Sequence, residues 1–66
     1  MKNSDMERRE YNVVVLDARE RTRREYVVSA LSEDDAIDNW NNPRYSMMQQ
    51  SQVVAPTVSE VSAQLA

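Results

Sequence analysis

The chain contains no cysteine and no histidine, so neither disulfide bonds nor a zinc cluster can stabilise its fold. A chain of 66 residues buries only about 60% of its extended surface on folding, which leaves room for one small hydrophobic core. Stability must therefore come from close packing or from a partner. We expect a single domain over residues 1–66, in which 1–9 form a flexible leader and 56–66 a weakly ordered tail.

The charge of the chain is mildly acidic and unevenly spread. Eleven acidic and eight basic residues give a formal net charge of −3, and the acidic excess lies entirely in residues 32–66. Such a surface favours solubility and disfavours general binding to duplex nucleic acid. No apolar run approaches the roughly 18 residues of a membrane span, and the first residues lead into charge rather than a signal sequence. We therefore expect no membrane association and a cytoplasmic location.

Two β-rich runs, Tyr11 to Leu16 and Arg23 to Leu31, are separated by a short charged stretch. Their β-branched and aromatic residues are typical of strands, and together they predict an antiparallel β-hairpin from about Glu10 to Leu31. The chain has no glycine, and the tightest hairpin turns need residues with positive φ. We therefore expect a longer loop around Ala18 to Arg21.

Alternation along the two strands assigns their side chains to two faces. One face should form the core, and it carries Tyr11, Val13, Val15, Tyr26, Val28 and Ala30. The opposite face receives Val14, Leu16 and Val27, which makes it more apolar than a solvated sheet surface usually is. Something is expected to cover it.

A helix is predicted to begin at Ser32, which can accept a hydrogen bond from a free amide of the first turn. Acidic residues at 33–35 suit the positive end of the helix dipole. Ala36, Ile37 and Trp40 form a narrow apolar stripe that can lie on the hairpin. Pro43 ends the helix near Asn41, because the residue before proline leaves the α region. The fold class is thus α+β, a hairpin packed by one helix of about nine residues.

The C-terminal third gives weaker patterns. The run from Gln49 to Ala55 predicts a short third strand. Thr57 and Glu60 have capping-box spacing, so a short C-terminal helix over residues 57–65 is expected, although valine and serine are poor helix formers and a frayed tail is the alternative.

No residues point to catalysis, because the chain lacks a histidine base, a cysteine nucleophile and a glycine-rich phosphate loop. We expect neither an enzyme nor a cofactor. Glu33, Asp34, Asp35 and Asp38 lack the spacing and the glycine of a calcium loop. Helix capping explains these acids better than a metal site, so no metal is expected.

Four arginines lie within six residues at the loop end of the hairpin: Arg19, Arg21, Arg23 and Arg24. Guanidinium groups bind phosphates well, so a nucleic-acid arm is one reading of this cluster. Asp17, Glu20 and Glu25 lie among the arginines, and a solvated, self-paired loop is the preferred reading.

The candidate binding surface is a protein-protein interface. It combines the outer hairpin face, the acids of the helix and two flexible methionines: Val14, Leu16, Val27, Asp34, Asp35, Asp38, Met47 and Met48. Exposed apolar groups bordered by charge usually mark an interface, and methionine adapts to different partners. A homodimer and a complex with another protein are both compatible with this surface.

The stretch from Tyr11 to Trp40 resembles the small hairpin-plus-helix domains of the DpnD/PcfM-like group, in its two strands and its acid-rich helix start. Such domains belong to phage, plasmid and other mobile-element genes. The resemblance implies a small acidic inhibitor that docks on a host defence complex, as anti-CRISPR proteins do. Two alternatives stay open, a nucleic-acid accessory protein that uses the arginine loop and a structural subunit that self-assembles through Val14 and Leu16.

Overall fold

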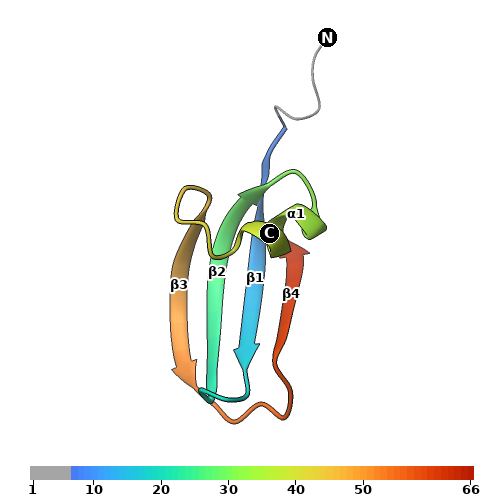
Figure 1. Cartoon of the computed structure of the whole chain (residues 1–66). Coiled ribbons are helices and arrows are strands. Elements are labelled where there is room, and N and C mark those ends of the chain that lie inside the picture. The colour runs from blue at the N-terminus through green and yellow to red at the C-terminus, as the bar shows by residue number, and fades with distance from the viewer. Residues whose placement is uncertain (1–6) are drawn as a thin grey trace.

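The computed structural model describes residues 7–66, which form a four-stranded antiparallel sheet with one helix on it (Figure 1). In chain order the elements are β1 (Arg9–Asp17), β2 (Thr22–Ala30), α1 (Glu33–Asn39), β3 (Ser46–Val53) and β4 (Glu60–Leu65). The strand order in the sheet is β3-β2-β1-β4, so β3 and β4 are the edge strands. Most of the expected leader, residues 1–6, lies outside the described residues.

The predicted hairpin is confirmed. β1 and β2 pair along their whole length, from Arg9 opposite Ala30 to Asp17 opposite Thr22, and the connection is the four-residue loop that the lack of glycine predicts. Arg21 takes the positive φ of 59° that glycine would usually supply in such a turn. The Asp17 carboxylate closes the loop by accepting hydrogen bonds from the amides of Arg19 and Glu20.

The core lies on the face of the sheet that alternation predicted. Its buried side chains are Tyr11, Val13, Val15, Val28, Ala30 and, from the helix, Ala36. Tyr26 and Trp40 pack against this cluster, with their ring centroids 5.2 Å apart. The contact fixes Trp40 over β2, as the sequence predicted.

Helix α1 begins as expected, because the Ser32 hydroxyl accepts a hydrogen bond from the amide of Asp35 at 3.1 Å. It ends at Asn39, two residues earlier than predicted, so it has seven residues rather than nine. The chain turns immediately afterwards, where the Asn42 amide donates to the Asn39 carbonyl. Asn41, Asn42 and Pro43 are typical turn residues, so the sequence indicated the turn but not its exact start.

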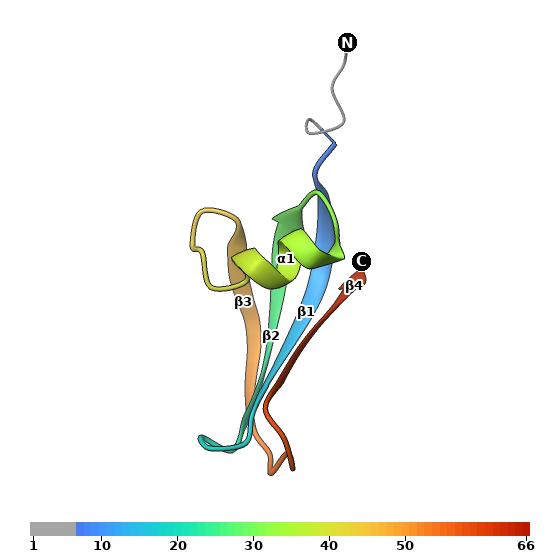
Figure 2. The same cartoon turned by 45° about the vertical axis from the view of Figure 1, so that its right-hand side comes forward.

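The helix is much shorter than the sheet. Nine residues of β1 extend roughly 30 Å, whereas seven helical residues rise about 10 Å. Figure 2 shows α1 across one face, near the end of the sheet away from the β1–β2 loop, with the other face bare. The fold is therefore a two-layer structure at one end and a single sheet at the other.

Two predictions for the C-terminal third need correction. The third strand begins at Ser46 and ends at Val53, so it includes both methionines, which precede the predicted start at Gln49. The predicted C-terminal helix is wrong, because Glu60–Leu65 forms strand β4. Val61, Ala63 and Leu65 lie opposite Val15, Val13 and Tyr11. As a strand, this alternating apolar row pairs with the edge of β1 that the hairpin leaves open and extends the core. This gain outweighs the local capping-box spacing, which favoured a helix.

Candidate functional site: an uncovered sheet face

The strongest candidate surface is the face of the sheet opposite α1, called here the open face. Even-numbered residues of β1 and odd-numbered residues of β2 point to it, because the core takes the other set. Leu16 and Val14 are neighbours on this face of β1, Val27 lies diagonally from Val14, and Met47 lies directly opposite Val27. These four residues form a continuous diagonal band, the apolar stripe. No segment within residues 7–66 lies over it.

The stripe is only partly shielded by its own neighbours. Leu16, Val14 and Val27 are half-buried, whereas Met47 is 69% exposed. At the Met47 end lies a hollow of about 460 Å³. Its lining comes from the stripe, the start of β1 and the turn before β3: Glu10, Val27, Ser29, Pro43, Arg44, Tyr45, Ser46, Met47 and Gln49. A hollow of this size beside apolar side chains can receive a bulky side chain from a partner.

Charged residues border the stripe. Glu25 lies opposite Val14, and Arg23 and Glu60 lie on either side of Leu16. The Arg23 guanidinium donates to the Glu25 carboxylate, so the two charges largely offset each other. A polar rim around an apolar centre is the usual anatomy of a protein interface.

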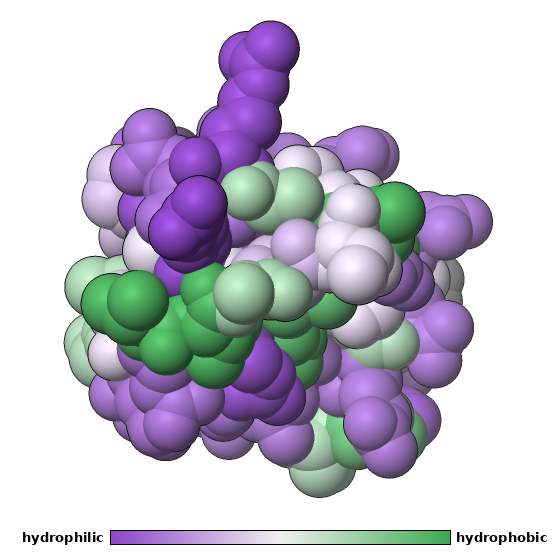
Figure 3. Space-filling model, turned by 90° about the horizontal axis from the view of Figure 1, so that it is seen from below, coloured by the Kyte–Doolittle hydropathy of each residue, from purple (hydrophilic) through white to green (hydrophobic). Residues whose placement is uncertain are grey.

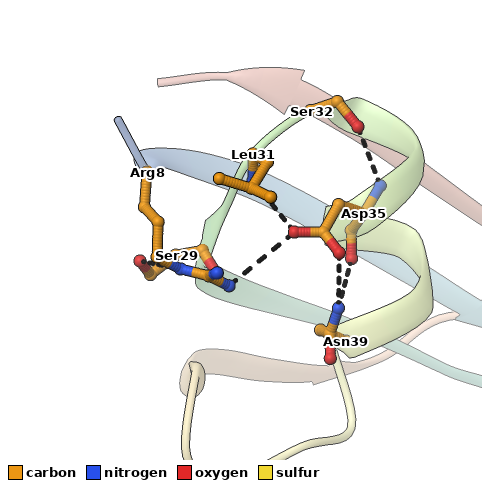
Figure 4. A network of polar contacts seen from close by, with 6 residues as sticks. All are labelled: Arg8, Ser29, Leu31, Ser32, Asp35 and Asn39. Carbon is orange, nitrogen blue, oxygen red and sulfur yellow. Dashed lines mark hydrogen bonds and ion pairs between the residues drawn. The ribbon is translucent and has the colours of Figure 1, made fainter. Parts of the chain in front are cut away.

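The three helix aspartates of the expected binding surface divide into one structural residue and two free ones. Asp35 accepts hydrogen bonds from the Leu31 amide and from the Asn39 side chain, both at 2.9 Å (Figure 4). Its carboxylate also lies 3.7 Å from the Arg8 guanidinium. Asp34 and Asp38 are exposed and make no such bonds among the described residues. The Asp35 carboxylate therefore stabilises the fold and is not free to bind a partner.

Arg8 joins this network to the end of the sheet. Its guanidinium donates to the Ser29 carbonyl at 2.9 Å and lies 4.2 Å from the centre of the Tyr45 ring. Arg8 therefore links the chain before β1, the helix and the turn before β3. The sequence had placed it in the flexible leader, and no local pattern identifies its partners.

The expected binding residues do not form a single surface. α1 packs on the core side of the sheet, so its free acids, Asp34 and Asp38, lie across the sheet from the stripe. Met48 pairs with Tyr26 on the core side, where it is 53% exposed, whereas Met47 belongs to the stripe. The structure therefore brings together Val14, Leu16, Val27 and Met47, and separates them from the acids and from Met48.

The four arginines are also dispersed. Arg19 and Arg21 are exposed in the β1–β2 loop. Arg23 points to the open face, while Arg24, its neighbour in β2, points to the opposite face beside Trp40. Arg19 and Arg24 line the same hollow, but Asp17 and Glu60 line it too. The four arginines therefore do not converge on a single phosphate site.

A second apolar area, which the sequence did not suggest, lies at the loop end of the sheet. Val53 is 86% and Val58 58% exposed. The Val54 amide donates to the Arg21 carbonyl, which holds the β3–β4 connection against the β1–β2 loop. Figure 3 looks onto this end and shows hydrophobic side chains gathered beside hydrophilic ones. The apolar run Val53-Val54-Ala55-Pro56 was the sequence feature that could have indicated this area. Whether these side chains are exposed depends on where β3 ends, which the sequence did not predict.

Residues 7–66 contain no cluster of three or more acidic, cysteine or histidine side chains able to hold a metal ion. Within the same range, α1 is far too short to cross a bilayer. Comparisons with protein-family models, with curated proteins and with solved structures gave no match.

Proposed function

We propose that the chain is a non-catalytic protein-binding module that docks through the open face of its sheet. The observation that carries the proposal is the apolar stripe, which runs across β1, β2 and β3 and has no cover within residues 7–66. A sheet that is covered on one face usually presents polar residues on the other. Apolar side chains bordered by charge on such a face are typical of an interface.

The hollow beside Met47 adds a second reason. Interfaces depend on a few well-packed anchor residues that fill pockets on the partner. A partner that lies on the stripe can insert one side chain between Tyr45 and Met47, where Glu10 and Arg44 offer polar contacts. The open face thus has both an apolar centre and an anchor site.

For the partner, we propose a host defence complex, with the chain acting as an anti-CRISPR-like inhibitor in the host cytoplasm. Support comes from the resemblance of Tyr11 to Trp40 to DpnD/PcfM-like domains and from the small size and net charge of −3. Asp34 and Asp38 lie on the other side of the sheet from the stripe. Any attraction of a basic partner by these two acids is therefore separate from docking on the stripe.

The test uses cells that carry a nuclease-based defence system and are challenged with a phage that the system restricts. Expression of the chain should restore plaque formation, and Leu16→Asp should lower this effect at least 10-fold, because docking would bury an unpaired carboxylate. Asn41→Asp adds the same charge on an exposed residue after the helix and should have no effect. Equal activity of the two variants would exclude the open face, and failure to protect against any system in a broad panel would exclude the partner class.

The nucleic-acid alternative has less support, because the Arg23–Glu25 pair is self-neutralised and Arg24 faces the other way. Only Arg19 and Arg21 remain as exposed cations of the cluster. Binding through them would weaken steeply as salt rises, whereas docking through the stripe would not. A salt-sensitive gel shift that Arg19→Ala and Arg21→Ala abolish would favour this alternative.

A further inference from the structure

Strand β3 is unusual because it is uncovered on three sides. Of its eight residues only Ser46 is half-buried, and the other seven are exposed. The helix packs against β1, β2 and β4, so it does not shield the core-side residues of β3. The edge of β3 away from β2 has no neighbour among residues 7–66. Its outward-pointing amides and carbonyls are available to another strand.

The composition of β3 does not protect this edge. Natural edge strands usually carry lysine, other charges or proline, which discourage pairing with another chain. The segment Ser-Met-Met-Gln-Gln-Ser-Gln-Val contains none of these, whereas β1, β2 and β4 all contain ionisable residues. A bulge opposite Glu25 and Tyr26 is the only irregularity in its pairing with β2. After the bulge, residues Gln50 to Val53 are regular.

We propose that β3 pairs with β3 of a second copy of this chain, giving a continuous eight-stranded sheet. Two copies with a net charge of −3 repel each other overall. Of the two edge strands, β3 carries no charged side chain, whereas β4 carries Glu60. Its side chains are also self-complementary. An amide both donates and accepts hydrogen bonds, so a glutamine can bind another glutamine.

The sequence of β3 gives the register. Gln50 and Gln52 share the open face, opposite Glu25 and Arg23. In an antiparallel pair related by a two-fold axis at Ser51, Gln50 of each copy lies opposite Gln52 of the other, and the two Ser51 residues face each other. The axis keeps both apolar stripes on the same side of the enlarged sheet, free for the partner of the proposed function.

A cysteine placed at the axis tests the register directly, since the chain has no other thiol. Opposed residues of antiparallel strands have Cα atoms about 4.5–5.5 Å apart, within the range of a disulfide. Ser51→Cys should therefore form a disulfide-linked dimer in a glutathione redox buffer. Ser62→Cys, an exposed serine in the other edge strand, is the matched control and should stay largely monomeric.

Light scattering measures the same association without a crosslink. The mass should rise from 7.7 kDa towards twice that value between about 1 μM and 1 mM, the range of weak contacts. Ser51→Lys should weaken the dimer at least 10-fold by opposing two ammonium groups at the axis, while Ser62→Lys and Leu16→Asp should leave it intact. A monomer throughout this range, equal crosslinking of the two cysteine variants, or loss of the dimer in Leu16→Asp would each overturn the proposal. Loss of the dimer in Leu16→Asp would place self-association on the open face instead. Absence of any dimer would leave the proposed docking through the stripe unaffected.

Discussion

Asp35 and Asp34 form a natural matched pair for asking whether the helix acids serve the fold or a partner. Both lie in the first turn of α1, so replacing either by alanine removes the same charge near the positive end of the same helix dipole. Only Asp35 loses partners, namely the Leu31 amide, the Asn39 side chain and the nearby Arg8 guanidinium. The difference between the two variants therefore isolates these contacts.

The expected size of that difference follows from the geometry. Each side-chain hydrogen bond contributes about 0.5–1.5 kcal/mol net, and the Asp35 side chain is 30% exposed, which favours the lower half of this range. The ion pair with Arg8 at 3.7 Å adds little at such an exposed site. Asp35→Ala should thus lower the free energy of unfolding by about 1–2 kcal/mol more than Asp34→Ala.

Thermal and urea unfolding followed by circular dichroism measure this difference. In a domain of this size each kcal/mol corresponds to about 4–8 °C in Tm, so the two variants should be well separated. Asp35→Asn is a useful third variant, because its side-chain oxygen can still accept from the Leu31 amide and should recover part of the loss. If Asp34→Ala and Asp35→Ala unfold at the same midpoint, the network of Figure 4 does not stabilise the fold.

Three further substitutions test other parts of the fold by the same unfolding measurements. Ser32→Ala removes the side-chain acceptor at the helix start and should cost about 1 kcal/mol; an unchanged urea midpoint would contradict the cap. Arg21→Gly should be neutral or stabilising by up to about 1 kcal/mol, because it relieves a positive φ that is costly for other residues, whereas Arg19→Gly gains no such relief and should not stabilise. Val13→Ala opens a cavity in the core and should cost about 2 kcal/mol, while Val14→Ala on the open face should cost less than half as much; equal costs would mean that the open face is covered.

The sequence predicted the hairpin, its two faces and the helix cap because these depend on neighbours in the chain. Alternation placed Val13 and Val14 on opposite faces, and Ser32 was recognisable from its position before three acids. These features require no knowledge of distant partners, and the structure confirms them.

Strand β4 and the role of Arg8 could not be found in this way. The segment Glu60 to Leu65 fits both a helical stripe and an alternating strand, and only its pairing with β1 decides between them. Arg8 lies in a charged stretch without periodicity, yet it contacts Ser29 and Tyr45. The sequence also could not show that the stripe and the acids Asp34 and Asp38 lie on opposite sides of the sheet, because this depends on which face the helix covers.

The pairing of β1 with β4 also affects the order in which the chain folds. β1 is an inner strand, yet one of its neighbours is the last strand in the sequence. The hairpin and α1 join segments that are close together in the sequence, so their contacts can form early. The pairing of Leu16 with Glu60 closes a long loop and is expected to form later, because closing a longer loop costs more entropy. Until β4 pairs, β1 has an open edge and an incompletely covered apolar row, which is the stage of folding most exposed to aggregation.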